Sequence, residues 1–309
     1  MNSFHRQQGG RSRHRCSGAA LMLSLWALFV LSAMIISWAL QIDSRLQLNG
    51  NAARVMEAEA MACSGSEIAL HPAVTPGSSI LRGGISRTQT YAARITGEGG
   101  RLNLNWLVAG ENPARLELLR KYLETQDIDL NERDHMIDCL LDWVDPDNLV
   151  RLNGAEADDN YRPRNTLFPR VEELRQVRGW EEFTARPDWD ANFTVNSTGP
   201  IDLAWAPREL LLSLPGMTEP LVDQFLTFRR GPDEIDATED DPEFKSIEDV
   251  RVSLGFSTEQ FKQLAPLVGF RDQVVRVVSV GKSGDVSRTV QMVVRKAGNA
   301  LQLISWKEL

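Results

Sequence analysis

The sequence is poor in the residues on which most enzyme active sites depend. Of its 309 residues only four are histidine and three are cysteine. His5 and His14 precede the first hydrophobic segment, and neither His71 nor His135 lies near an obvious nucleophile. The sequence has no Gly-x-Ser-x-Gly motif and no glycine-rich phosphate loop. The sequence therefore gives no support to an enzymatic function.

Basic residues are also scarce beyond the first hydrophobic segment. The whole chain has 34 Lys and Arg against 42 Asp and Glu, and residues 1–40 hold four of the basic residues and no acid. The remainder thus has 30 basic residues and 42 acids, a net charge of −12. Because nucleic-acid binding depends on clustered Lys and Arg, this balance argues against DNA as a ligand, and it is compatible with cation binding.

Cysteine is too rare to form a framework of several disulfides. Cys16 lies before the hydrophobic segment, which leaves Cys63 and Cys139 for the rest of the chain. One disulfide between these two residues and two buried free thiols are both compatible with the sequence.

The chain has one hydrophobic run that is long enough to cross a membrane. Residues 19–40 contain no charged residue. As a helix they span roughly 33 Å, about one hydrocarbon core, whereas the core of a cleaved secretory signal has only ~7 to 15 residues. Four arginines precede the run and no acid occurs before Asp43. The positive-inside rule therefore places the amino terminus in the cytoplasm and the part after residue 41 outside, which is the periplasm in a Gram-negative bacterium.

The junction before this run distinguishes it from an ordinary anchor. A basic leader ends at Gly18, and the apolar run begins at Ala19. This junction resembles that of type IV pilins and type II secretion pseudopilins, which a prepilin peptidase cleaves after the glycine on the cytoplasmic side. The resemblance implies a leader over 1–18, a mature terminus at Ala19 and a transmembrane helix over 19–40.

One position in the apolar run departs from the common pilin pattern. Pilins usually carry Glu at the fifth mature position, where it meets the positive terminus of the neighbouring subunit, but here that residue is Leu23. A charge buried among apolar helices needs a partner, and Leu23 offers none. A subunit of this kind is expected at the tip of a filament.

Helix-forming composition continues beyond the membrane segment and predicts a stalk helix over 41–71. The segment is weakest near residues 49–51, and His71 followed by Pro72 ends it, since the residue before proline avoids helical geometry. Apolar side chains recur on one face of the stalk, and we expect partner contacts there. The residues that we assign to partner binding are Leu23, Ile42, Leu46 and Val55.

Strand patterns occur at two places that are far apart in the sequence. Residues 91–96 and 101–105 alternate in polarity around a glycine-rich turn and predict a hairpin. Near the carboxyl terminus, three β-branched runs separated by GKSGD and KAGN predict three antiparallel strands. We therefore predict an α+β fold, with an antiparallel sheet built from 72–105 and 271–309 and an all-α insertion over 106–270.

The predicted insertion contains a repeat. LPGMTEPLVDQF at 214–225 aligns with SLGFSTEQFKQL at 253–264. Both have the outline of a helix-hairpin-helix unit, in which the glycine permits a tight turn and the next residue, Met217 or Phe256, packs between the helices. DNA-binding versions have a second glycine where this chain has a hydroxyl residue, which favours structural packing over nucleic-acid binding.

The strongest indication of a ligand is an acidic segment within 138–162. Clustered acids repel unless a cation or solvent intervenes, and hard carboxylate oxygens suit Ca²⁺. The alternative is a solvated acidic loop. A second acidic run at 232–243 is a weaker candidate, because no turn residues constrain it. The five candidate ligands in the first segment are Asp145, Asp147, Glu156, Asp158 and Asp159.

The spacing of three of these acids is that of an EF-hand loop. Asp145, Asp147 and Glu156 would occupy positions 1, 3 and 12 of such a loop. The match then fails, because Leu149 takes a ligand position and Val150 stands where a glycine turn is required. An ordinary EF-hand is therefore not expected.

Several segments along nearly the whole chain share the pattern of one known family. They are the leader without a fifth-position Glu, GGRLNLNWL, LLDWVDPD followed by GAEADDNY, RNTLFPRVEELRQVRGW, LLSLPGM and the closing LQLISW. Together they resemble the K-type minor pseudopilins of the type II secretion system. The family usually has Gly-Ala-Glu-Asp where this chain has GAEADD, so Asp158 and Asp159 are alternative donors of the expected oxygen.

The resemblance implies both a fold and a function. The fold is pilin-like, with a large helical insertion that binds Ca²⁺. The function is that of a non-enzymatic inner-membrane protein at the tip of the pseudopilus, which initiates or caps assembly with the I-, J- and H-type minor pseudopilins for export of folded proteins. The alternative is a membrane-anchored extracellular DNA receptor that uses the two hairpins.

Overall fold

The computed structural model describes residues 17–238, 241–242, 244, 246–297 and 300–309. The leader up to residue 16 and the side chain of Leu46 lie outside the described part. The chain divides into two compact units, one up to Arg54 and one from Val55 to Leu309, and each is described by itself.

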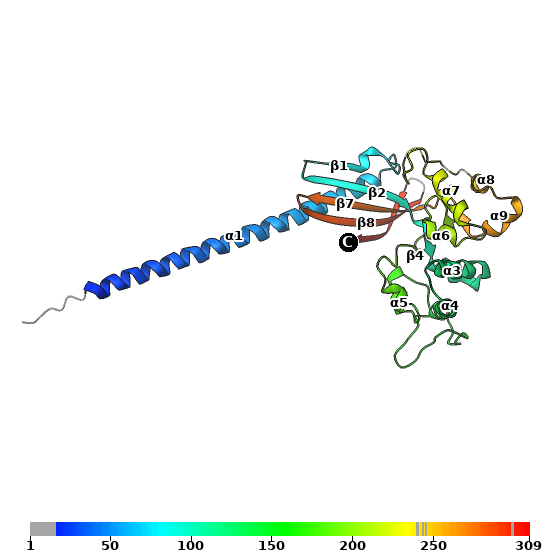
Figure 1. The fold of residues 1–309 in the computed structure, drawn as a ribbon, viewed down its shortest axis with the longest axis horizontal. Coiled ribbons are helices and arrows are strands. Elements are labelled where there is room, and N and C mark those ends of the chain that lie inside the picture. Colours follow the sequence, from blue (N-terminus) through cyan, green and yellow to red (C-terminus); the bar gives the residue numbers. More distant parts are fainter. Residues whose placement is uncertain (1–16, 239–240, 243, 245, 298–299) are drawn as a thin grey trace, which may run out of the picture. The chain divides into compact units, whose positions relative to one another are not determined.

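One long helix, α1 (Ser17–Ala69), contains the predicted membrane segment and the predicted stalk up to Ala69, two residues short of the predicted end (Figure 1). Its stretch Ala19–Ile42 has a mean hydropathy of 2.4 and is long and apolar enough to cross a membrane. The side chains of Leu23 and Ile42 are exposed, and that of Val55 is half-buried. The helix continues through residues 49–51, where the sequence predicts weakness, because Asn and Gly lower helix propensity without removing a backbone donor as proline does.

The second unit contains a five-stranded antiparallel sheet with the order β1-β2-β7-β8-β9 (Figure 1). Two strands, β1 (Arg82–Gly84) and β2 (Gln89–Gly97), precede the insertion. The other three are the predicted carboxyl-terminal strands, which the structure confirms. They are β7 (Val274–Ser283), β8 (Val286–Ala297) and β9 (Ala300–Glu308).

The predicted hairpin between 91–96 and 101–105 is wrong. Strand β2 pairs with β1 and β7, and the chain then turns away through a 3-10 turn, η2 (Glu98–Gly100). The next strand, β3 (Leu102–Asn103), pairs in parallel with β4 (Phe193–Thr194) inside the insertion.

The reason for this difference lies in the residues that follow η2. The side chain of Asn103 accepts a hydrogen bond from the backbone N–H of Trp106 and caps α2 (Leu104–Val108). Leu102, Leu104 and Leu107 are all fully buried. The alternation that predicts a strand over 101–105 is thus a two-residue strand followed by the first turn of an amphipathic helix.

The carboxyl-terminal part of α1 packs closely on the sheet. A Cβ added at Gly281 of β7 would lie 2.0 Å from the carbonyl oxygen of Ala58 and 2.2 Å from the amide nitrogen of Ala62. Such contact between backbones requires small residues on both elements. The apolar core of this region joins α1 to the three central strands, through Ala62, Ala69, Ala93, Ile95, Val277, Val290, Met292 and Val294.

The insertion between β2 and β7 is largely helical. It also contains two short parallel pairs, β3 with β4 and β5 (Ile201–Asp202) with β6 (Val268–Gly269), so the prediction of an all-α insertion is corrected. Its α-helices after α2 are α3 (Pro113–Thr125), α4 (Leu130–Val144), α5 (Glu181–Thr184), α6 (Arg208–Leu212), α7 (Glu219–Arg229), α8 (Ile247–Ser253) and α9 (Thr258–Leu264). The insertion also contains the 3-10 helices η3 (Ala109–Glu111) and η4 (Val171–Gln176), and a further one, η1 (Ser79–Leu81), precedes β1.

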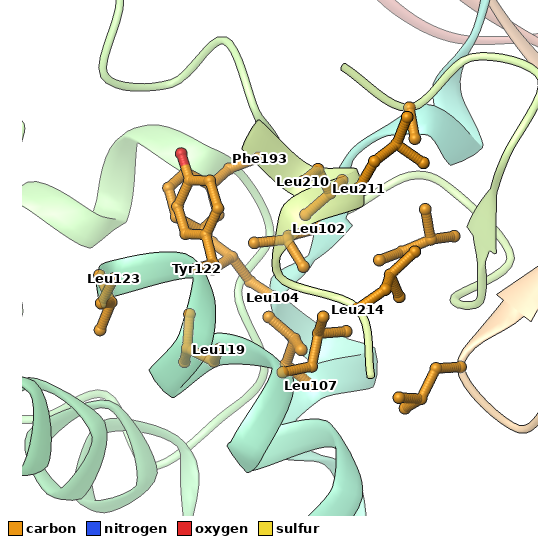
Figure 2. Close-up of a cluster of buried hydrophobic side chains, with 14 of the residues drawn as sticks. Leu102, Leu104, Leu107, Leu119, Tyr122, Leu123, Phe193, Leu210, Leu211 and Leu214 are labelled. Carbon is orange, nitrogen blue, oxygen red and sulfur yellow. The ribbon is translucent and has the colours of Figure 1, made fainter. Parts of the chain in front are cut away.

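The insertion has a hydrophobic core of its own. Figure 2 shows leucines of β3, α2, α3 and α6 around Tyr122 and Phe193. These two rings meet edge to face with their centroids 5.5 Å apart. Because this core is separate from the core between α1 and the sheet, the insertion is a packed substructure with its own hydrophobic interior.

The sequence repeat forms two helix-turn-helix units, α6–α7 and α8–α9. The turns pass through Gly216 and Gly255, which have φ angles of +80° and +66° that favour glycine. Met217 and Phe256 are buried, and the Phe256 ring lies 3.3 Å from the Cβ position of Gly216, so the two turns pack against each other. The bulky residue after each glycine therefore serves packing, as the sequence indicates.

The two cysteines in the described part of the chain are free thiols. Cys63 packs against the core between α1 and the sheet, and Cys139 lies in the core of the insertion. The disulfide alternative is therefore not realised in this structure.

Candidate metal centre

The candidate metal centre forms at the carboxyl-terminal end of α4. Asp142 lies in the last turn of this helix with no exposed side-chain surface, and Asp145 is the residue that ends it. Glu156 approaches from the following loop, and one oxygen from each of the three carboxylates lies within 4.8 Å of the other two. The structure thus brings together two residues predicted from the sequence, Asp145 and Glu156, and adds Asp142.

Arg151 lies among these acids. Its Nη1 donates to Oδ1 of Asp142 at 2.5 Å and also to Oδ2 of Asp145. Its Nη2 donates to Oε1 of Glu111 in η3 at 2.7 Å. The backbone N–H of Arg151 donates to the second oxygen of Asp142, at 3.3 Å. Both oxygens of Asp142 therefore have donors from a single residue.

The loop that carries Arg151 and Glu156 is fixed to α4 at a second place. The backbone and side-chain nitrogens of Asn153 both donate to Oδ2 of Asp138, each at 3.1 Å, and Nδ1 of His135 lies 2.5 Å from the Asn153 carbonyl oxygen. A Cβ on Gly154 would lie 2.0 Å from Oδ2 of Asp142, so any side chain there would displace the Asp142 carboxylate. These contacts position the acids before any ligand binds.

The carboxylate of Glu156 has no counter-charge in the described part of the chain. Both of its oxygens and Oδ1 of Asp145 are buried, and none of the three has a side-chain donor among the described residues, although the Ala157 backbone N–H acts on Glu156 and opposes the rise in its pKa. Burial raises the pKa of Glu156, and the charges of Asp142 and Asp145 raise it further. Buried acceptors without donors destabilise a protein unless an unseen partner binds them.

These donors fit a hard divalent cation. Asp142, Asp145, Glu156 and the Glu111 that shares Arg151 carry four negative charges when ionised against one positive charge, so a doubly charged ion would reduce the excess negative charge from three to one. Calcium prefers oxygen ligands, several of them carboxylates, and tolerates irregular geometry. The unpaired oxygens of Asp145 and Glu156 are the ones that would bind it, with further oxygens from the loop or from water.

The other three predicted ligands lie outside this group of acids. Asp147 accepts a hydrogen bond from the Leu149 backbone N–H at 2.8 Å, although its charge still contributes to the raised pKa of Glu156. Asp158 pairs with Arg178 at 2.6 Å, a hydrogen bond that lowers the pKa of Asp158. Asp159 is exposed.

Asp142 was missed because it lies within the apolar run CLLDWV, which predicts only a buried helix. One signal was nevertheless present in the sequence. Residues three apart share a helix face, so Asp142 and Asp145 had to project toward the same side at the end of α4.

The second acidic run, 232–243, falls partly outside the described residues, at 239, 240 and 243. Asp236 pairs with Arg229 and Arg230, and Asp241 accepts from the backbone N–H of Ala237 at 2.7 Å. Asp236 and Asp241 are thus occupied by partners from the same segment or from the end of α7. The only group of acids found close enough to hold a metal among the described residues is the one around Asp142.

Among the described residues, the features of a pilin-like fold are a helix with a stretch of membrane-spanning length, an antiparallel sheet packed on the carboxyl-terminal part of α1, and a helical insertion. A family model described as type II secretion system (T2SS), protein K, matches residues 100–186. This segment of the insertion is thus similar to protein K of the type II secretion system. No curated protein sequence matches the chain.

A solved structure extends the similarity in fold beyond the matched segment. The chain is similar to a chain in the crystal structure of the GspK-GspI-GspJ complex from the type 2 secretion system of enterotoxigenic Escherichia coli, with a TM-score of 0.56 and 11% sequence identity. The match covers 87% of this chain and 99% of that chain. The pilin-like fold with its insertion is therefore shared over nearly the full length of the solved chain.

Proposed function

We propose that this protein is a K-type minor pseudopilin of the type II secretion system and that it occupies the tip of the pseudopilus, where it initiates or caps assembly for the export of folded proteins across the outer membrane. The observation that carries the proposal is the helical insertion with its own hydrophobic core, built between two neighbouring strands of the pilin-like sheet. Packed helices lie roughly 8 to 10 Å apart, and a subunit repeated at that spacing would have to accommodate the insertion at every step. A single copy at the end of the filament avoids this crowding.

The residue at the fifth mature position supports the same placement. Leu23 lies exposed on α1, within the stretch of membrane-spanning length. An acid at this place would neutralise the terminal amine of a subunit ahead, and a leucine leaves such an amine without a partner in the membrane. The subunit therefore fits the first position of the filament.

The partners that we propose are the I-, J- and H-type minor pseudopilins. The solved relative was crystallised as a complex of GspK, GspI and GspJ, and this chain shares its fold. We expect the exposed face of α1 at Leu23 and Ile42, together with Leu46 and the half-buried Val55, to pack against the stalk helices of these partners. Burial of apolar area is not screened by salt as charge pairs are, so the contacts should persist at moderate ionic strength.

The membrane arrangement follows from the leader and the apolar helix. We propose that the prepilin peptidase cleaves after Gly18, that 19–40 spans the inner membrane among its lipids, and that the part from residue 41 onward lies in the periplasm. The arginines before the helix support a cytoplasmic amino terminus.

We further propose that the acids at the end of α4 bind Ca²⁺. Bound calcium would supply positive charge and coordination to oxygens that otherwise lack partners. Asp145 and Glu156 would hold it directly, and Arg151 and Gly154 would keep Asp142 in place beside them. The unpaired buried oxygens support this role for the loop over that of a solvated acidic loop.

The experiment that tests the tip position is assembly of the full chain with its partners. The chain would be co-expressed with I- and J-type pseudopilins, purified in detergent and counted by native mass spectrometry. We expect one copy of this chain in each complex, and labelling of intact filaments should find it at one end. A homo-oligomer that excludes the partners, or labels at intervals along the shaft, would contradict the proposal.

A further inference from the structure

Arg151 forms ion pairs with three of the carboxylates in and around the acidic centre. Through one guanidinium group it contacts Asp142, Asp145 and Glu111, which lie at two different segments of the insertion. Its side chain is only 21% exposed, and that of Asp142 is fully buried. Removing one partner of such a group leaves a buried charge without compensation.

The oxygens of the centre fall into two sets. Those of Asp142 and Oδ2 of Asp145 are bound by Arg151, whereas Oδ1 of Asp145 and both oxygens of Glu156 have no side-chain donor among the described residues. Calcium takes about six to eight oxygen ligands, so these three leave further positions for the loop, for water and for oxygens that Arg151 now binds. Asp145 is the residue whose two oxygens belong to different sets.

We propose that Arg151 is the resident cation of this centre, and that a divalent metal ion and its guanidinium compete for Asp145. The inference rests on the calcium role proposed above and adds a residue that controls it. Two cations within a few ångströms repel each other strongly in a partly buried site, so metal binding at Asp145 displaces the guanidinium.

Glu111 can remain an ionic partner of the guanidinium after Arg151 releases Asp145. It already binds Nη2 of Arg151 at 2.7 Å and has a side chain that is 59% exposed, so it lies on the solvent side of the site. Arg151 can therefore release Asp145 without losing all of its ionic partners. The metal and η3, which contains Glu111, are thereby connected through one side chain.

Two roles of Arg151, competition with calcium and support of its ligands, predict opposite changes in calcium affinity for Arg151→Gln. If Arg151 competes with calcium, Arg151→Gln strengthens calcium binding and lowers the stability of the metal-free protein. If Arg151 merely orients the carboxylates, Arg151→Gln weakens calcium binding, because the ligands lose their position.

The experiment is a calcium titration of the full chain in detergent, by isothermal calorimetry, after chelator has been removed. We expect Arg151→Gln to lower the Kd at least about tenfold and to lower the melting temperature measured in chelator. Arg178→Gln is the matched control, because it removes an arginine that pairs with Asp158 in the same loop but does not contact the centre. Its Kd should stay within about twofold of the unchanged chain.

A second variant keeps the test decisive if Arg151→Gln fails to fold. Glu111→Gln alters only an exposed side chain, and we expect it to raise the Kd about threefold, because the displaced guanidinium loses its alternative partner. In a chain that also carries Arg151→Lys, this effect should shrink, since lysine cannot bridge two carboxylates as arginine does.

The outcomes separate the inference from the proposal beneath it. No calcium binding by the unchanged chain would overturn the calcium site itself. Calcium binding that is equal or weaker in Arg151→Gln would overturn the competition and leave the site in place. A Kd for Glu111→Gln equal to that of the unchanged chain would also overturn it.

Discussion

Glu98 and Arg276 are joined by two hydrogen bonds, Nε to Oε2 and Nη2 to Oε1, each 2.7 Å long, although 178 residues separate them in the chain. Glu98 begins the segment that leaves the sheet after β2, and Arg276 lies in β7, where the chain has returned. The carboxylate is fully buried and also accepts from Thr194 and Arg101. The pair therefore closes the base of the insertion.

The first prediction concerns this ion pair. Burial alone would raise the pKa of Glu98, but the hydrogen bonds and charge of Arg276, with the charge of Arg101, outweigh it and hold the pKa below its usual value. We expect Glu98→Gln to lower the free energy of unfolding at pH 7 by roughly 3 kcal/mol, since it leaves buried arginines uncompensated.

The pH dependence of this loss has a definite sign. A lowered folded-state pKa gives stability that is present above the unfolded-state value, near 4.3 for Glu, and is lost as the pH falls through the folded-state pKa. The difference between the unchanged chain and Glu98→Gln should thus be full at pH 7 and shrink below about pH 4. Denaturant unfolding at both pH values measures it, with the exposed Glu117→Gln as the control. An equal difference at the two pH values would count against the assignment.

The second prediction concerns the contact between α1 and β7. Gly281→Ala places a methyl group against the backbone of Ala58 and Ala62, and we expect a loss of about 1 to 3 kcal/mol or more from overpacking. Gly269→Ala is the matched control, because its nearest neighbour, the Cβ of Pro200, lies at an ordinary 3.5 Å. Thermal melting of both variants in detergent compares them. Equal melting temperatures would show that the helix does not lie this close to the strand.

The third prediction concerns calcium. Chelation should lower the melting temperature, because a ligand that binds only the folded state stabilises it by about 2.7 kcal/mol at a hundred times its Kd. Glu156→Gln and Asp145→Asn should remove the difference between calcium and chelator. Asp158→Asn should retain it, since that carboxylate pairs with Arg178. Identical melting curves of the unchanged chain in calcium and in chelator would favour the alternative that the loop is a solvated acidic segment.

The substitution Asp147→Ala distinguishes the spacing seen in the sequence from the cluster seen in the structure. The EF-hand-like spacing predicts that this substitution abolishes calcium binding. The structure leads us to expect weaker binding without abolition, because Asp147 acts on Glu156 by charge and is not one of the three acids whose oxygens converge. A calcium titration of Asp147→Ala shows whether binding is abolished or only weakened.

The fourth prediction concerns the leader. Mass spectrometry of the membrane-bound protein should find a mature terminus at Ala19, and Gly18→Leu should block maturation. Gly10→Leu, in the same leader but away from the junction, should mature normally. A terminus near Gln41 would instead mean removal of the whole apolar run as an ordinary signal, and would overturn the pseudopilin-type processing.

The sequence predicts those parts of the fold that depend on local pattern. The β-branched runs of β7, β8 and β9 lie next to one another and pair with one another, so composition and turns suffice. The partner of β2 could not be predicted in this way, because Gly97 pairs with Val275 across the entire insertion. The nearer segment, 101–105, was the better candidate by spacing alone.

In the candidate site, too, the sequence predicts the residues that stand out locally and misses those whose role depends on the fold. Asp145 and Glu156 stand out in the sequence because they lie among loop residues, where acids are conspicuous and spacing can be counted. Asp142 and Arg151 acquire their roles from the end of α4 and from contacts across the loop. A count of acids along a sequence does not show which of them an arginine has already neutralised.

The pairing of Gly97 with Val275 has a topological consequence. Spatial order and chain order are the same in the five-stranded sheet, and each neighbouring pair is antiparallel, so the sheet is a simple meander. The whole insertion occupies the place of one hairpin turn in this meander, and its two ends leave and re-enter at adjacent strands. A tight turn from β2 to β7 would restore an uninterrupted up-and-down sheet, so the insertion can vary in size or content without changing a single strand neighbour.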